Sequence, residues 1–68
     1  IMYDKETYRT ILNGLKKYVK LSVIAKECGI HQPNLSKFLK DSAYNDTMSV
    51  ENLDLLYKSV KSTLINLI

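Results

Sequence analysis

Residues 21–40 read LSVIAKECGIHQPNLSKFLK, and this stretch is the most informative part of the sequence about the fold. Ala25 and Gly29 stand four residues apart within it. A small side chain at Ala25 lets a following helix cross closely, and Gly29 readily adopts the positive φ that a sharp turn between helices needs. The apolar positions that would pack between two such helices are Ile24, Cys28, Ile30, Leu35 and Phe38. We therefore expect two short helices that cross tightly around Gly29.

The ends of these two helices carry their own signals. Ser22 is a good N-cap for the first helix, and Gly29 is a natural C-terminal stop. The second helix is expected to cover about residues 32–40, with Pro33 in its first turn, where a missing N–H is tolerated.

Helical periodicity continues towards the N-terminus. Residues 5–19 are predicted to form a helix with Asp4 as its N-cap. Its apolar stripe consists of Tyr8, Ile11, Leu12, Leu15 and Val19. Gly14 lies inside this helix and indicates either a close approach by another element or no special role.

Towards the C-terminus, residues 41–47 lack an apolar period and are expected to form a loop. Ser49 is predicted to cap a further helical segment, residues 49–68, with Met48 packed over its start. This segment forms either one helix or two, the second capped by Ser62. Few glycines or prolines and no strand-like alternation predict an all-α fold, a compact four- or five-helix domain with a central helix-turn-helix.

Composition restricts the class of protein. Sixty-eight residues suffice for a single domain, residues 1–68. Cys28 is the only cysteine, which excludes an internal disulfide and suits a reducing compartment, so we expect a cytoplasmic protein. One cysteine and one histidine, His31, cannot close a zinc site. We expect no cofactor, no small-molecule ligand, no membrane span and no enzymatic activity, because no catalytic set of residues is visible.

The charge balance favours an anionic partner. Ten basic residues against seven acidic ones give a net charge of +3. Six of the nine lysines lie between residues 16 and 40, in and just before the two crossing helices: Lys16, Lys17, Lys20, Lys26, Lys37 and Lys40.

The spacing of Ala25, Gly29 and the five apolar positions closely resembles the helix-turn-helix of the lambda-repressor-like (Cro- or Xre-type) family. The segment QPNLSKFL also resembles recognition helices of that family, and the likeness extends more loosely over most of the chain. The resemblance implies a sequence-specific regulator of transcription that binds double-stranded DNA, of the phage- or mobile-element-type repressor kind. It also implies that the helix at about residues 32–40 enters the major groove while the preceding helix crosses the DNA backbone.

The outer face of the helix at residues 32–40 carries side chains that can read base edges. Glutamine pairs with adenine, lysine donates to guanine, and serine bonds to either. The expected base contacts are Gln32, Pro33, Ser36 and Lys37, with Pro33 against a thymine methyl group.

Contacts to the DNA backbone are expected from the flanks of this helix. The candidates are Lys20, Ser22, Lys26, His31, Lys40, Tyr44, Asn45 and Thr47. For His31, helix capping is the alternative role, and for the loop and second-helix residues the alternative is ordinary solvated surface.

The end of the chain is unusually apolar. Leu64, Ile65, Leu67 and Ile68 exceed what a chain terminus normally carries. We expect them to form a homodimer interface on an inverted-repeat operator, with half-sites ~34 Å apart, or else to dock on a further domain. The alternative to DNA binding is a protein-interaction module on a helix-turn-helix scaffold, inhibitor or antitoxin-like, whose apolar C-terminal surface binds a different protein.

Overall fold

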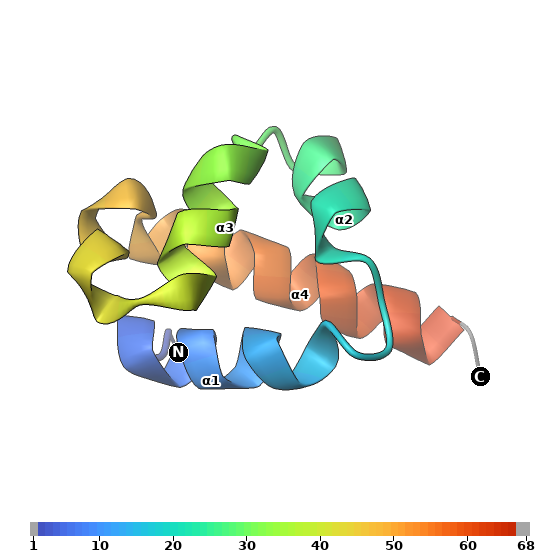
Figure 1. The fold of residues 1–68 in the computed structure, drawn as a ribbon. Helices are drawn as coiled ribbons and strands as arrows, with labels where there is room; N and C mark the ends of the chain where they lie inside the picture. Colours follow the sequence, from blue (N-terminus) through green and yellow to red (C-terminus); the bar gives the residue numbers. More distant parts are fainter. Residues whose placement is uncertain (1, 67–68) are drawn as a thin grey trace.

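The computed structural model describes residues 2–66. This part of the chain contains five helical elements joined by short turns. They are α1 (Lys5–Leu15), α2 (Leu21–Glu27), α3 (Gln32–Lys40), the 3-10 helix η1 (Ser42–Thr47) and α4 (Val50–Asn66). In Figure 1, α1 and α4 lie side by side and run in the same direction, while α2 and α3 lie above them. The predicted all-α class and the number of helices are confirmed.

A single apolar core lies between these helices. The largest fully buried side chains are Tyr8, Leu12, Phe38, Leu53, Leu56 and Val60. Helix α2 adds Leu21, Ile24 and Ala25. Within each helix these positions repeat at three- or four-residue spacing, so each helix turns one stripe to the core. Burying such side chains contributes ~1.5–3 kcal/mol each and holds α2 and α3 in place on α4 and α1.

The connection between α2 and α3 has the geometry that the sequence predicts. Gly29 has φ +76°, the only positive φ among the described residues. The Ile30 amide donates to the Ala25 carbonyl at 2.8 Å, which closes the end of α2. Ala25 is completely buried at this crossing. Pro33 lies in the first turn of α3, as expected.

Three predictions about secondary structure are wrong: the end of the first helix, the start of the second, and the loop at residues 41–47. Helix α1 ends at Leu15 rather than residue 19, because a turn over residues 16–18 redirects the chain so that Leu21 reaches the core. Helix α2 starts at Leu21, so Ser22 lies within its first turn and does not cap it. The stretch at residues 41–47, expected to be a loop, is largely η1, whose first turn is closed by the Asp41 carboxylate accepting from the Ala43 amide at 3.1 Å.

The C-terminal segment is one helix as far as the structure describes it. The Ser49 hydroxyl accepts from the Asn52 amide at 3.1 Å, which confirms the predicted cap, and Met48 beside it is buried. Ser62 lies in the interior of α4 and starts no new helix. Within residues 2–66 there is no helix with the length and apolar character that crossing a membrane would need.

The two glycines offer a matched test of these backbone assignments. A Cβ at either position would meet no described atom within 4 Å, so steric clash plays no part. Gly14→Ala is expected to raise the free energy of unfolding by ~0.5–1 kcal/mol, because alanine favours a helix interior. Gly29→Ala is expected to lower it by ~1–2 kcal/mol, because alanine is strained at positive φ. Urea denaturation of both variants measures the two shifts, and shifts of the same sign would contradict the assignment of the turn.

Candidate nucleic-acid interface

The outer face of α3 carries only neutral and basic side chains. Leu35 and Phe38 point into the core, whereas the predicted base-contact residues Gln32, Pro33, Ser36 and Lys37, and also Lys40, are all exposed. No acidic residue occurs in α3, and its last turn holds both lysines, where the helix macrodipole favours positive charge. The structure therefore brings all the predicted base-contact residues onto one accessible face.

A hydrogen bond between α2 and α3 positions one of these side chains. The Gln32 amide nitrogen donates to the Ser22 carbonyl oxygen at 2.8 Å. One amide hydrogen is used in this bond, so the other hydrogen and the amide oxygen stay available to a partner. The predicted contact residue Ser22 thus has a structural role through its backbone, while its side chain is exposed next to α3.

The turn between α2 and α3 forms a hollow of about 400 Å³ on the same side of the molecule. It is lined by Lys26, Ile30, His31, Gln32 and Pro33. His31 occupies the N-cap position of α3, but its side chain makes no capping hydrogen bond with any described residue. Both Lys26 and His31 are exposed at this hollow, so the structure places these two predicted backbone-contact residues beside the outer face of α3.

Lys20 lies elsewhere. It lines a different hollow, on the side of α2 that faces α4, together with Tyr18, Val23, Glu27 and Thr63. The sequence analysis predicted Lys20, Ser22 and Lys26 together as contacts to the DNA backbone, but the structure separates Lys20 from the other two. Its contact with a phosphate stays a prediction.

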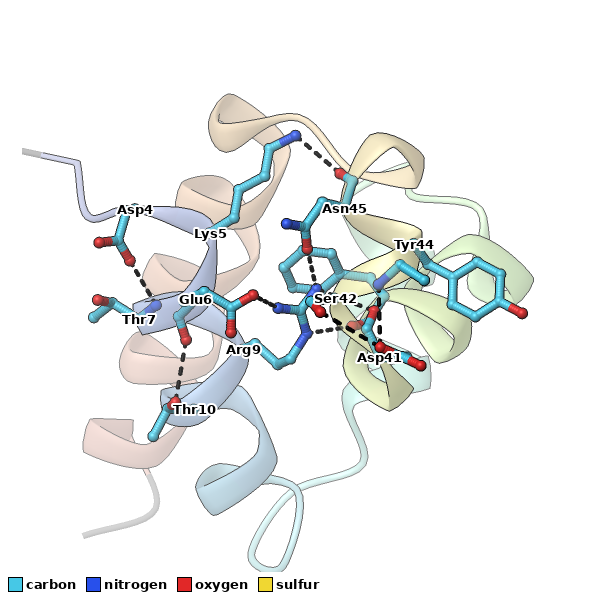
Figure 2. Close-up of polar contacts among 12 residues, drawn as sticks. Asp4, Lys5, Glu6, Thr7, Arg9, Thr10, Asp41, Ser42, Tyr44 and Asn45 are labelled. Atoms are coloured by element: carbon cyan, nitrogen blue, oxygen red, sulfur yellow. Dashed lines mark hydrogen bonds and ion pairs between the residues drawn. The ribbon is translucent and has the colours of Figure 1, made fainter.

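The predicted contact residues that follow α3 have different environments. Asn45 accepts a hydrogen bond from Arg9 through its side chain, and its backbone carbonyl accepts from the Lys5 ammonium at 2.9 Å. The Thr47 hydroxyl contacts the carbonyl oxygens of Tyr44 and Asn34, at 2.7 and 3.1 Å. Tyr44 is 41% exposed, and its ring points away from this network in Figure 2. Of these predicted residues, Tyr44 is the one whose side chain lies open to a partner.

Arg9 organises this region, and the sequence analysis did not identify it. Its Nε donates to the Phe38 carbonyl at 2.6 Å, and its Nη2 donates to the Asp41 carbonyl at 3.3 Å and to the side chain of Asn45 (Figure 2). Its Nη1 pairs with Glu6, and the guanidinium lies 4.2 Å from the centre of the Phe38 ring. Arg9 thereby joins α1 to the end of α3 and to η1. The available signal was that it is the only arginine in the chain.

A second buried polar group lies between α1 and α4. The Tyr8 hydroxyl donates to Asp54 Oδ1 at 2.8 Å, and Lys58 Nζ lies 2.9 Å from Asp54 Oδ2. The hydrogen bonds from Lys58 and Tyr8 hold the pKa of the Asp54 carboxyl below its ordinary value. Burial, reinforced by the bond to Asp54, raises the pKa of the Tyr8 phenol. Both shifts favour a charged carboxylate beside a protonated phenol.

This group predicts how stability depends on acid pH. Because the pKa of Asp54 is lowered in the folded state, its contribution is present above the unfolded-state pKa, about 3.9, and is lost as the pH falls through the folded value. Asp54→Asn is expected to reduce the loss of stability between neutral pH and pH ~2, measured by urea denaturation at a series of pH values. Asp46→Asn, at an exposed carboxyl, is the control and should retain the full loss. An unchanged pH profile in Asp54→Asn would show that the Asp54 carboxylate does not stabilise the fold.

No protein-family model matches the sequence, and no similar chain was found among curated proteins or solved structures. The functional proposal therefore rests on the geometry of the chain itself.

The shape and chemistry of this surface suit a polyanion whose groove exposes hydrogen-bonding groups. Helix α3 spans nine residues and is therefore ~13 Å long, and its width matches the major groove of B-DNA, ~12 Å across. Its exposed face offers hydrogen-bond donors from Gln32, Ser36, Lys37 and Lys40, and the neighbouring hollow adds Lys26. Hydrogen-bond donors of this kind can bond to base edges, and cations beside them can contact phosphates.

Proposed function

We propose that this protein is a sequence-specific regulator of transcription that binds double-stranded DNA, of the phage- or mobile-element-type repressor kind. In this proposal α2, the turn at Gly29 and α3 form a lambda-repressor-like helix-turn-helix. The observation that carries it is the outer face of α3, whose side chains are exposed, include no acidic residue and offer many hydrogen-bond donors. The hydrogen bond from Gln32 to Ser22 supports it, because it holds that face at a defined angle to α2.

Each group of residues has a role in this proposal. Gln32, Ser36 and Lys37 read base edges in the major groove, and Pro33 contacts a thymine methyl group. Phosphates on either side are contacted by Ser22, Lys26, His31, Lys40 and Tyr44, which the structure leaves exposed around α3. The phosphate contacts set affinity and register, whereas the base contacts set sequence preference.

Selection from a random duplex DNA pool tests the proposal. The protein is incubated with the pool at about 150 mM salt, where screening weakens non-specific attraction, and the bound DNA is sequenced. We expect enrichment of an inverted repeat with half-site centres about ten base pairs apart or a multiple of that. The double variant Lys37→Ala/Lys40→Ala should enrich no motif.

The matched control is Lys16→Ala/Lys17→Ala. It removes the same two charges, but from the exposed turn after α1. This control should recover the same motif as the unmodified protein. If the unmodified protein enriches no sequence at all, the proposal fails and the protein-interaction interpretation takes its place.

A further inference from the structure

A groove runs between α2 and the C-terminal half of α4. It consists of two adjoining hollows, of about 440 and 310 Å³, which share Ile24, Glu27 and Thr63 as lining residues. The larger hollow extends to Cys28 and Ser59, and the smaller one to Tyr18 and Val23. We call this the α2–α4 groove. Neither Ser22 nor Lys26 lines it, and no residue of α3 does, so it is separate from the proposed DNA-binding face.

The rim of the α2–α4 groove exposes apolar surface. Tyr18 is 74% exposed and Val23 is 50% exposed, both on the α2 side. On the α4 side, Ile65 is 60% exposed and follows Ser62, a lining residue, by one helical turn. Tyr18 and Ile65 are the most exposed large apolar side chains among residues 2–66. Apolar side chains gathered around a hollow are typical of a surface that a partner covers.

The same side of α2 carries two opposite charges whose placement the isolated chain does not explain. Lys20 is at the N-cap position and Glu27 is the last residue of α2, two helical turns away, with Val23 between them. The helix macrodipole favours the reverse order, an acidic residue at the start and a basic one at the end. Neither Lys20 nor Glu27 forms an ion pair within the described part of the chain.

We propose that a second copy of this chain covers the α2–α4 groove, related by a twofold axis that crosses α2 near Val23. A twofold axis there sets the two α2 helices antiparallel. Lys20 of each copy then faces Glu27 of the other, so the surface is complementary to itself in charge. Val23 meets its counterpart, and Tyr18 of each copy covers the apolar rim of the other.

This interface differs from the one expected from the sequence. Four apolar residues were predicted to form the dimer interface. One of them, Leu64, packs against the core of its own chain, so less of its side chain is available to a partner. Leu67 and Ile68 lie outside the described residues. Ile65 remains exposed, one helical turn beyond the groove-lining residue Ser62. The α2–α4 groove therefore shifts the centre of the interface from the end of α4 to α2.

The α2–α4 groove alone corresponds to a small interface. Interfaces below ~1,200 Å² in total bind weakly, so we expect dissociation in the micromolar range without DNA. The outer face of α3 stays open, because no residue of α3 lines the α2–α4 groove. This inference goes beyond DNA binding and is tested without DNA, so either proposal can fail while the other stands.

The test measures molecular mass by sedimentation equilibrium across a range of protein concentrations. The unmodified chain is expected to approach twice its 7.8 kDa mass at high concentration and to dissociate on dilution. Lys20→Glu and Glu27→Lys should each weaken association at least tenfold, because each sets like charges opposite one another twice in the dimer. The double exchange Lys20→Glu/Glu27→Lys should restore association.

A mixture of the two single variants gives the sharpest result. In a mixed pair, one copy carries acidic side chains at both positions and the other carries basic ones, so both contacts across the axis join opposite charges. The two variants should therefore associate with each other although neither associates with itself. Circular dichroism checks that each variant keeps its helices; the exchanges are also compatible with the macrodipole of α2.

Lys37→Glu, on the exposed outer face of α3, and Glu51→Lys, at the exposed start of α4, are the controls and should leave association unchanged. Three results would overturn the proposal: a chain that stays monomeric throughout, association that is insensitive to both charge changes, or failure of the double exchange to restore association.

Discussion

Replacing Arg9 with methionine is expected to lower the free energy of unfolding by about 3 kcal/mol. Hydrogen bonds from a charged group contribute ~1.5–3 kcal/mol each, and the stacking of the guanidinium on Phe38 adds ~0.5–1 kcal/mol. Methionine retains the apolar stem but leaves the Phe38 carbonyl and the Asn45 side chain without their donor. A domain of this size is stable by only roughly 3–10 kcal/mol, so the midpoint of thermal unfolding should fall by roughly 12–25 °C.

Two further variants define what Arg9 contributes. Arg9→Lys keeps the charge but loses the planar fork, so its stability should lie between those of the unmodified protein and Arg9→Met. Lys16→Met removes an exposed charge just after α1 and should change stability by less than ~0.5 kcal/mol. If Arg9→Met unfolds within that same margin of the unmodified protein, Arg9 does not hold α1, α3 and η1 together.

The second large effect concerns DNA, and it depends on the proposed function. Lys37→Ala is expected to relax base preference at one position of each half-site by about 1–3 kcal/mol, or roughly 5–150-fold, because Lys37 lies on the outer face of α3 where base edges are read. Binding titrations with the selected duplex and with single-base variants of it measure this loss of discrimination. Affinity for unrelated duplexes should change far less.

A matched variant separates base reading from phosphate attraction. Lys26→Ala removes one charge at the α2–α3 hollow, so it should weaken binding to all duplexes alike and reduce the slope of log affinity against log salt by about 1. Lys61→Ala removes the same charge from α4 and should change neither quantity. If Lys37→Ala weakens every duplex equally, Lys37 contacts phosphate and does not read a base.

Several features were predictable from the sequence because they depend on near neighbours. Asp4 and Ser49 cap their helices as expected, since a cap is a contact within three residues. The inward face of α3 follows from helical spacing, and the residues left outside include Lys37. Helical spacing does not, however, say which outward residues share a surface with those of another helix, as the separate positions of Lys20 and Lys26 show.

Helix boundaries depended on packing more than on local preference. Ser22 has the better capping side chain, yet α2 begins two residues earlier than a cap at Ser22 would allow, with Lys20 as its N-cap and Leu21 buried at its start. The first helix stops at Leu15 although its apolar stripe continues to Val19. In both cases the chain follows the path that brings Leu21 onto the core, and the burial of one large apolar side chain outweighs a cap worth about 1 kcal/mol.

Local sequence is enough to specify the crossing of α2 and α3, because Ala25 and Gly29 act through steric limits on their own backbone and nearest turn. It also determined that α3 presents a neutral and basic outer face. The role of Arg9, whose partner Phe38 lies 29 residues away, follows only from the packing of the helices, and so does the position of Lys20 beside Glu27 and Thr63. Such pairings depend on how whole helices pack, since contacts between distant segments leave no periodic trace in either segment alone.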